Sequence, residues 1–499
     1  MSWFEVAQRE PGTPALVDGT QSITFGELRS VVARIAASWD EAGVPRGGSV
    51  AVVLPNCSEL LAIELAALST ERYFVPVNRH LTAPEIAYIL GNCGPSLVVT
   101  NDELLPVVEA AAAGIRVFTT GPGFERAWAH LPDADPRDRR AGSVTYYSSG
   151  TTGRPKGVHR ALSGATPEQD VELSRATWPL LGLTPGPGIH VAVAPLYHPA
   201  PNSMVLGALA RGVTVTFAPG GRFDASRFLR FAGESGMTES FLVPTMFVRL
   251  LQLPGEERAA FDPGRLRAVV HAGAPCPPPV KHRMIEWWGP VLEEFYGSTE
   301  SAVTTTVHSR EWLEAPGTVG RARPGYTIEI RDAAGAPVPA GAEGLIHISG
   351  SPPFEYLGDP GKTRDSRSGD ALVLGDVGRL DEQGRLFVLD RRTDLILSGG
   401  VNVYPAEVES ALLGHPLVVD LAVVGLPDDE WGQRVVAVVQ PAAGADRAAL
   451  PGELAAYTEA RLAKFKRPRE YRVVAEIPRM ATGKVNRSAL RAQVLRELA

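Results

Sequence analysis

A run of hydroxyl, glycine and basic residues at positions 147–158 is the part of this sequence that most directly indicates chemistry. It reads Tyr-Ser-Ser-Gly-Thr-Thr-Gly-Arg-Pro-Lys-Gly-Val. Backbone N–H groups of such a loop can turn toward one anion, and glycine lets the chain approach that anion closely. The Ser and Thr hydroxyls add short donors, and Arg154 and Lys156 add positive charge. The run therefore predicts a polyphosphate-binding loop, although it lacks the Gly-Lys-Ser/Thr ending of a Walker A motif.

Three further motifs follow the loop along the chain. Tyr-Gly-Ser-Thr-Glu occupies 296–300, Gly375-Asp376 precedes Asp-Arg-Arg-Thr-Asp at 390–394, and Pro-Arg-Met-Ala-Thr-Gly-Lys occupies 478–484. In this order the four motifs resemble those of the adenylate-forming superfamily, which includes acyl-CoA synthetases, peptide-synthetase adenylation domains and luciferases. The resemblance covers essentially the whole chain. It implies an ATP-dependent acid–CoA ligase that uses ATP, Mg²⁺ and coenzyme A and makes an acyl-AMP intermediate.

The resemblance also implies the nucleotide site. Its residues would be Ser148, Ser149, Gly150, Thr151, Thr152, Gly153, Lys156, Gly273, Ala274, Pro275, Tyr296, Gly297, Thr299, Asp376, Arg391 and Lys484. Tyr296 offers a flat face for adenine, and Asp376 would accept the ribose hydroxyls with Arg391 assisting. Glu300 is the hard oxygen ligand expected for Mg²⁺. The catalytic set would be Thr152, His198, Glu300 and Lys484, with the compact ammonium of Lys484 reaching between acyl and phosphate oxygens.

The acid pocket is expected around Tyr197-His198. The resemblance implies that its lining includes Tyr197, His198, Pro199, Ser203, Ala274 and Ala302. The segment 191–209 contains no Asp, Glu, Lys or Arg, so a pocket built from it suits an apolar acid and binds a free α-amine poorly. A fatty, aryl, terpenoid or steroid-like acid is the expected substrate. Phe-Asp-Ala-Ser at 223–226 imitates the amine-binding motif of peptide synthetases, but it follows the strand expected at 213–217 and lies too late in the chain for that role.

Alternating patterns indicate an α/β fold of helix-covered sheets. Strands are expected at 49–54, 96–100, 191–194, 213–217 and 266–270, and helices at 58–68, 83–91 and 226–232. In the apolar helix at 58–68, Glu59 and Glu64 have amphipathic spacing, which predicts a water-facing side.

By resemblance, residues 1–392 form a large multi-subdomain adenylation domain that binds ATP and the acid. Residues 393–499 form a small mobile α+β domain that carries the catalytic lysine. Thr393 would be the hinge, where relatives usually have Asp or Lys. Gly399 and Gly400 would face CoA.

Composition narrows the function classes. The chain has 499 residues, a formal net charge of −7 and a pI near 5.9, which argues against nucleic acid as the main partner. No uncharged apolar run of 18 residues is present, so no membrane span is expected. Three scattered cysteines suit a reduced cytoplasm better than a disulfide framework or a zinc site. The expected partners are the acid, ATP and CoA, and a homodimer is left open.

Three alternative functions compete with an acyl-CoA synthetase of fatty acid metabolism. The first is an adenylating enzyme that passes its acyl-AMP to a carrier protein or a separate transferase. The second is a ligand-binding pseudoenzyme, against which the retained Thr152, Glu300, Asp376 and Lys484 argue. The third is a luciferase-like oxygenase, which shares the motifs but is rare.

Overall fold

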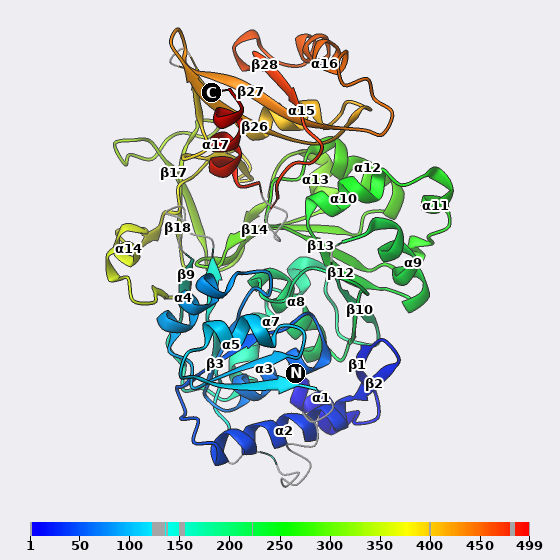
Figure 1. The fold of residues 1–499 in the computed structure, drawn as a ribbon, viewed down its shortest axis with the longest axis vertical. Helices are drawn as coiled ribbons and strands as arrows, with labels where there is room; N and C mark the ends of the chain where they lie inside the picture. The colour runs from blue at the N-terminus through cyan, green and yellow to red at the C-terminus, as the bar shows by residue number, and fades with distance from the viewer. Residues whose placement is uncertain are drawn as a thin grey trace.

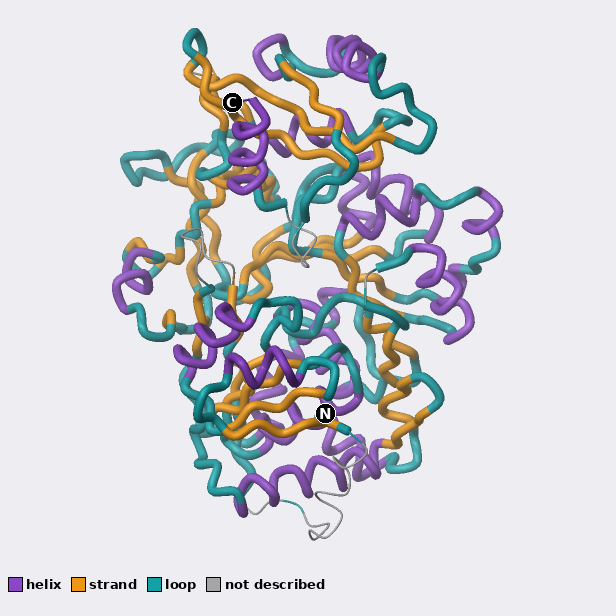
Figure 2. Tube along the Cα trace, viewed as in Figure 1, coloured by secondary structure: helices purple, strands orange, loops and turns teal. Residues whose placement is uncertain are grey.

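The computed structural model describes residues 2–121, 135, 138–148, 155–221, 223–398, 401–479 and 485–498. A large body carries the N-terminal four fifths of the chain, and a smaller body made by the C-terminal segment lies against it at the top of Figure 1. Strands and helices are mixed throughout both bodies (Figure 2). The expected α/β architecture, with a large N-terminal and a small C-terminal part, is confirmed.

The largest sheet has nine strands in the order β16-β15-β14-β13-β12-β10-β11-β1-β2. The strands are β1 Pro14–Asp18, β2 Gln21–Thr24, β10 Ile189–Ala192, β11 Thr214–Phe217, β12 Glu239–Leu242, β13 Ala268–His271, β14 Leu292–Ser298, β15 Ala302–His308 and β16 Arg321–Ala322. The associated helices are α7 Pro167–Arg175, α8 Pro199–Ala210, α9 Ala225–Ser235, α10 Pro244–Leu251, α11 Gly255–Ala259, α12 Pro278–Trp288 and α13 Ser309–Glu314. The expected strands at 191–194 and 266–270 are present with shifts of about two residues, which is ordinary for element ends.

A second sheet of parallel strands has the order β6-β5-β3-β4-β7. Its strands are β3 Ser49–Val53, β4 Tyr73–Pro76, β5 Leu97–Asn101, β6 Arg116–Thr120 and β7 Ser143–Val144, and the helices of this region are α1 Trp3–Arg9, α2 Phe25–Glu41, α3 Ser58–Ser69, α4 Ala83–Cys93 and α5 Leu105–Ala111. Along β3, Val50 and Val52 join the core that contains α2 and α3, whereas Ala51 and Val53 join the core of α4 and α5. Burial on both faces explains why β3 reads as a continuous apolar run.

Two smaller sheets complete the large body. One has the order β19-β9-β8, and the other has the order β20-β21-β18-β22-β23 with β17 paired to β18. Their elements are β8 Tyr146–Ser148, β9 Lys156–His159, β17 Thr327–Arg331, β18 Gly344–Ser349, β19 Glu355–Tyr356, β20 Arg367–Ser368, β21 Ala371–Leu372, β22 Asp376–Leu380, β23 Leu386–Arg391 and α14 Pro360–Asp365.

The C-terminal body is one sheet covered by helices on both faces. Its order is β25-β24-β27-β26, with β28 paired to β27. The elements are β24 Ile396–Ser398, β25 Val401–Val403, β26 Val418–Asp428, β27 Gly432–Pro441, β28 Glu470–Val473, α15 Pro405–Leu412, α16 Leu450–Glu459 and α17 Arg487–Leu498. Along β26, Leu421 and Val423 pack with α15 and α16, whereas Ala422 and Val424 pack with α17.

One expectation about a helix was wrong. Helix α3 forms where predicted, but almost every residue in it is buried, and Glu64 has no exposed surface. The helix is therefore apolar on all sides, and its carboxylate points into the protein rather than toward water. Within the described residues, no helix is both long and apolar enough to cross a membrane.

Candidate active site

The phosphate-loop motif begins and ends on two paired strands. Strand β8 precedes it and β9 follows it, with Ser148 opposite Lys156 in the antiparallel register. This pairing brings the two ends of the motif together. Several predicted residues lie outside the described part of the chain: Ser149, Gly150, Thr151, Thr152, Gly153, Gly399, Gly400 and Lys484.

One cavity of about 820 Å³ collects the other predicted nucleotide residues. Every predicted nucleotide-binding or metal residue that the structure describes lines it: Ser148, Lys156, Gly273, Ala274, Pro275, Tyr296, Gly297, Thr299, Glu300, Asp376 and Arg391. These residues come from three sheets and from loops that are far apart in the sequence. The cavity is large enough for a nucleotide and part of a second substrate.

Asp376 is held at the cavity wall by two donors. It is the first residue of β22 and lies opposite Arg391 of β23. Its Oδ2 accepts a 2.7 Å hydrogen bond from the Tyr296 hydroxyl, and its Oδ1 accepts one of 3.2 Å from Arg391 Nε. An ionised carboxylate has about four acceptor positions, so Asp376 retains capacity for further donors such as ribose hydroxyls. Burial and the neighbouring carboxylate raise the pKa of Tyr296 well above its ordinary value.

The turn at 297–302 places Glu300 in the cavity. At Gly297 any Cβ would lie 2.0 Å from the carbonyl oxygen of Ala302, so only glycine fits. Ala302 has φ of 57°, a left-handed conformation that is strained for alanine. The Ser298 Oγ accepts hydrogen bonds from the backbone N–H groups of Glu300 and Ser301 at 3.1 and 2.9 Å. These contacts give the carboxylate a defined position.

Two residues that sequence reasoning did not assign hold this turn. Tyr356 of β19 donates its hydroxyl to Glu300 Oε1 at 2.8 Å. Arg160 Nη2 donates to the carbonyl oxygens of Thr299 and Glu300 at 2.8 and 2.9 Å. Lys156 Nζ lies 5.0 Å from the centre of the Tyr356 ring. Tyr356 thus stands between the metal-ligand candidate and the lysine that follows the phosphate loop. Burial, followed by the Glu300 carboxylate, raises its pKa.

The geometry around Glu300 suits Mg²⁺. A protein cage would need several ligands, but the described residues contain no group of three or more His, Cys, Asp or Glu side chains placed to hold a metal. Mg²⁺ commonly uses one or two carboxylates and takes its other ligands from water and substrate phosphates. Glu300 lines the cavity beside Ser148 and Lys156, where phosphates are expected. A metal bound there would neutralise phosphate charge.

The segment before α8 is fixed by polar contacts. Asn56 donates to the carbonyl oxygen of Ala194 at 2.9 Å and accepts from the Leu196 N–H at 3.0 Å. The Tyr197 and His198 rings then meet edge to face, with centroids 4.5 Å apart. His198 is the N-terminal cap residue of α8.

The predicted acid-pocket residues are only partly brought together. Ala274 lines the cavity of 820 Å³, whereas Tyr197, His198, Pro199, Ser203 and Ala302 are not among its lining residues. Ser203 is exposed on α8, and its Oγ donates to the carbonyl oxygen of Ala200 at 2.9 Å. Of the six predicted acid-pocket residues, the structure therefore places only Ala274 on the large cavity.

A buried chain of hydrogen bonds joins α8 to the phosphate-loop strand. Tyr146 of β8 donates to Asn202 Oδ1 at 2.6 Å, and Asn202 Nδ2 donates to Glu64 Oε2 at 2.8 Å. Asn202 and Glu64 are fully buried. Burial raises the pKa of Glu64 to about 8, so this carboxyl group is neutral near pH 7. No sequence signal distinguished Glu64 from an ordinary helix carboxylate.

Residues of the C-terminal body close the cavity from above. Arg479 and Val485, which lie on either side of the segment 480–484, pair as an isolated antiparallel β-bridge, and both line the cavity. Arg479 makes two hydrogen bonds to the Asp420 carboxylate, at 2.6 and 2.7 Å. The structure therefore brings Arg479, inside the predicted lysine motif, and Val485, just after the motif, to the nucleotide residues. Lys484 itself lies outside the described residues.

Contacts near residue 393 join the two bodies. Asp390 Oδ2 accepts a hydrogen bond from the Ala406 N–H at 3.1 Å, and Tyr404 donates to Glu343 Oε2 at 2.6 Å. Burial raises the pKa of Asp390 to about 6. Thr393 is exposed between these contacts.

Comparisons with known proteins agree with this geometry. The AMP-binding enzyme family matches residues 3–355, and the AMP-binding enzyme C-terminal domain matches residues 407–484. A fatty acid–[acyl-carrier-protein] ligase, ScoC, from Streptomyces coeruleorubidus is 33% identical over 97% of this chain and 94% of its own length. A feruloyl-CoA synthase from Amycolatopsis sp is 33% identical over 97% of this chain and 96% of its own length.

A solved structure extends the likeness to three dimensions. The o-succinylbenzoate CoA synthetase MenE from Bacillus subtilis, in complex with its acyl-adenylate intermediate, matches with a TM-score of 0.82 and 28% identity over 98% of each chain. The chain is accordingly an ATP-dependent acid–thiol ligase of the AMP-forming type. With the family matched over most of the sequence and the predicted nucleotide residues gathered in one cavity, this chain belongs to the AMP-binding enzyme family, whose members form acyl adenylates.

Proposed function

We propose that this enzyme activates a hydrophobic monocarboxylic acid as acyl-AMP and transfers the acyl group to the thiol of coenzyme A. The observation that carries the proposal is one cavity lined by the predicted nucleotide residues and by Arg479 and Val485, which lie on either side of the segment 480–484 of the C-terminal lysine motif. Activation converts a carboxylate, which is a poor electrophile, into a mixed anhydride that a thiol can attack. This chemistry depends mainly on positioning and electrostatics.

The nucleotide roles that the family resemblance implies are consistent with the contacts in the cavity. Asp376 and Arg391 take the ribose hydroxyls, and Tyr296, anchored through its hydroxyl, presents its ring to adenine. Ser148 and Lys156, with the loop between them, take the β- and γ-phosphates. Glu300 is the carboxylate that holds Mg²⁺.

At the reacting end, Thr299 contacts the α-phosphate. Lys484 supplies the catalytic cation, and Thr152 and His198 complete the catalytic set. The position of Arg479 and Val485 on the cavity wall supports the assignment of Lys484.

The acid class is proposed from the charge around α8. The segment 191–209 carries no Asp, Glu, Lys or Arg. The buried Glu64 that contacts α8 through Asn202 is neutral near pH 7 because its pKa is about 8. An ammonium group placed there would be desolvated without an ionised partner. We therefore expect fatty, aryl, terpenoid or steroid-like acids to be used and free α-amino acids to be rejected.

The proposed domain boundary lies between residues 392 and 393, with Thr393 as the hinge. In support, β23 of the large body ends at Arg391 and β24 of the C-terminal sheet begins at Ile396. Gly399 and Gly400 follow β24 and are proposed to face the pantetheine arm. The few residues between the bodies are where a rotation of the smaller one would be absorbed.

A carrier protein is the second candidate acceptor. The similarity to ScoC, whose name specifies an acyl-carrier-protein acceptor, favours this reading specifically. The two acceptors present the same thiol chemistry. They differ only in the body attached to the pantetheine arm.

The test is pyrophosphate release across a panel of hydrophobic acids and amino acids, each with no acceptor, with CoA and with a phosphopantetheinylated carrier protein. Acid-dependent release that rises with CoA and yields acyl-CoA supports the proposal. Efficient use of a free α-amino acid would refute the acid class. If product forms with the carrier protein but not with CoA, the carrier protein and not CoA is the acceptor.

We also propose a cytoplasmic location and leave a homodimer as the oligomer to be tested by light scattering. Cys57, Cys93 and Cys276 are all unpaired. Burial is the main cause that raises the pKa of each thiol. One buried and two half-buried thiols that stay protonated suit a reducing compartment.

A further inference from the structure

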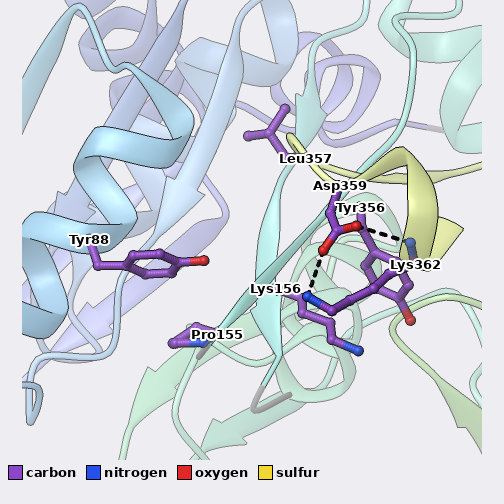
Figure 3. A pocket seen from close by; sticks show the side chains of 7 residues that line it. All are labelled: Tyr88, Pro155, Lys156, Tyr356, Leu357, Asp359 and Lys362. Atoms are coloured by element: carbon purple, nitrogen blue, oxygen red, sulfur yellow. Dashed lines mark hydrogen bonds and ion pairs between the residues drawn. The ribbon is translucent and has the colours of Figure 1, made fainter. Parts of the chain in front are cut away.

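A second cavity, of about 270 Å³, lies beside the nucleotide cavity at its phosphate end. Lys156, Tyr356 and Lys362 line both cavities, so the smaller one is a side pocket of the larger. Its other walls include Tyr88 of α4 and Asp359. Figure 3 shows the two lysine side chains, Tyr356 and Asp359 converging on one side of the pocket, with Tyr88 across from them.

The side pocket is built by ordered contacts rather than by a chance gap. Asn92 of α4 accepts a 2.6 Å hydrogen bond from the Tyr147 hydroxyl and donates to the carbonyl oxygen of Leu357 at 3.1 Å. These bonds tie together α4, the phosphate-loop strand β8 and the turn before α14. At the base of α14, Asp359 Oδ1 accepts from the Lys362 N–H at 3.0 Å.

The charge in the pocket favours an anion with several oxygens. Two lysine side chains and one carboxylate line it, and Lys362 Nζ contacts Asp359 Oδ2 at 2.5 Å. The Lys362 and Asp359 side chains are 39% and 36% exposed. An ion pair this exposed contributes little, so Lys362 can exchange its carboxylate partner for a phosphate oxygen at small cost.

Acid activation produces such an anion at this end of the cavity. An oxygen of the substrate carboxylate forms a bond to the α-phosphorus of ATP. The bond from that phosphorus to the oxygen bridging to the β-phosphate breaks, and pyrophosphate departs with the electron pair. The product carries most of the charge of the triphosphate, and it forms where the β- and γ-phosphates are proposed to bind, next to Lys156, which also lines the side pocket.

We propose that the side pocket binds pyrophosphate as it leaves, with Lys362 and Lys156 as its cationic partners. The proposal rests on acid activation in the adjoining cavity. When pyrophosphate binds, Lys362 turns from Asp359 to a phosphate oxygen while Lys156 keeps its place over the Tyr356 ring. The pocket thereby separates the leaving group from the acyl-AMP before the thiol acceptor enters.

The test uses Lys362→Met with Arg364→Met as its matched control. Arg364 is exposed on the same helix, so its substitution removes the same charge outside the pocket. Synthetic acyl-AMP and pyrophosphate are converted to ATP, and the KM for pyrophosphate is measured. We expect Lys362→Met to raise this KM by about tenfold, the loss typical of one charge-assisted contact, and Arg364→Met to leave it within about twofold. The KM for ATP in the forward direction should change much less.

A third variant, Asp359→Asn, should change the KM for pyrophosphate in the opposite direction. Asp359→Asn keeps a good helix cap but removes the competing carboxylate, so it should lower the KM for pyrophosphate a few fold. Calorimetric titration of each variant with pyrophosphate alone should give the same order of affinities without turnover.

Three results would overturn the proposal. If Lys362→Met and Arg364→Met changed the KM for pyrophosphate equally, Lys362 would not be part of the pyrophosphate site. Equal increases in the KM for ATP and for pyrophosphate would make it part of the ATP site. An increase in the KM for pyrophosphate in Asp359→Asn would exclude the proposed switch of Lys362 from Asp359 to a phosphate oxygen. If the unmodified enzyme shows no acid-dependent exchange between ATP and pyrophosphate, acid activation itself is refuted instead, so the two failures are distinguishable.

Discussion

Replacing Tyr356 by phenylalanine tests whether the position of Glu300 matters for adenylation. The change removes one hydroxyl that donates to Glu300 Oε1 at 2.8 Å and leaves the ring near Lys156 in place. A hydrogen bond to a charged group contributes about 1.5–3 kcal/mol. Removing a group that is hydrogen-bonded to a metal ligand typically lowers metal affinity or activity by about 10- to 100-fold. The two estimates agree, since about 1.4 kcal/mol corresponds to a tenfold change.

The assay is acid-dependent exchange between ATP and pyrophosphate, measured over a series of Mg²⁺ concentrations. We expect Tyr356→Phe to lower kcat/KM for ATP by about 10- to 100-fold, with part of the loss recovered at high Mg²⁺. Thermal unfolding should change little. Tyr471→Phe serves as the control, because it removes a hydroxyl that is hydrogen-bonded at 2.9 Å to Thr458, outside the cavity lining. Exchange kinetics of Tyr356→Phe that match the unmodified enzyme at every Mg²⁺ concentration would refute the reasoning.

Three further predictions concern Glu300, Lys484 and the buried Glu64. Glu300→Gln should weaken use of Mg²⁺ and ATP far more than it lowers the unfolding temperature, and normal exchange at ordinary Mg²⁺ would contradict its role as metal ligand. Lys484→Ala should abolish exchange but leave transfer from synthetic acyl-AMP to CoA largely intact; retained exchange would exclude Lys484 as the catalytic cation. Burial raises the pKa of Glu64 to about 8, so its contribution to stability is complete below its unfolded pKa and is lost as pH rises from about 4.5 toward 8. The unfolding temperature of the unmodified enzyme should therefore fall between about pH 6 and pH 9 by more than that of Glu64→Gln, as measured by thermal denaturation. Parallel plots of unfolding temperature against pH for the two proteins would be inconsistent with a neutral Glu64.

The nucleotide residues could be predicted from the sequence because each belongs to a short motif that resembles one of the adenylate-forming superfamily. Gly297 is required by the close approach of the Ala302 carbonyl, and Asp376 lies opposite Arg391 through strand pairing. Such constraints act over a few residues or between adjacent strands, so they leave a readable pattern. The residues of these motifs that the structure describes line one cavity.

Residues that support the motifs could not be predicted in the same way. Tyr356 belongs to a strand of two residues, and it reaches Glu300 only because β19 pairs with β9. Arg160 bonds to carbonyl oxygens 139 and 140 positions away along the chain. No local periodicity marks either residue, because the partner of each is set by tertiary packing. The same holds for Asn92, which shapes the side pocket from a helix of the second sheet region.

Three acidic residues around the site show why residue type alone does not define a role. Asp376 receives two side-chain donors, which keep the carboxylate oriented as an acceptor. Glu300 receives one hydroxyl on Oε1 and lines the cavity where phosphates are expected, which suits a metal ligand. Glu64 receives only an amide donor in complete burial, and burial keeps it neutral. In the sequence all three are simply acidic side chains, and Glu64 even has the spacing of a water-facing position. The donors that reach each carboxylate, and the exclusion of water from it, decide whether it suits a ribose acceptor, a metal ligand or a neutral buried group near the proposed acid pocket.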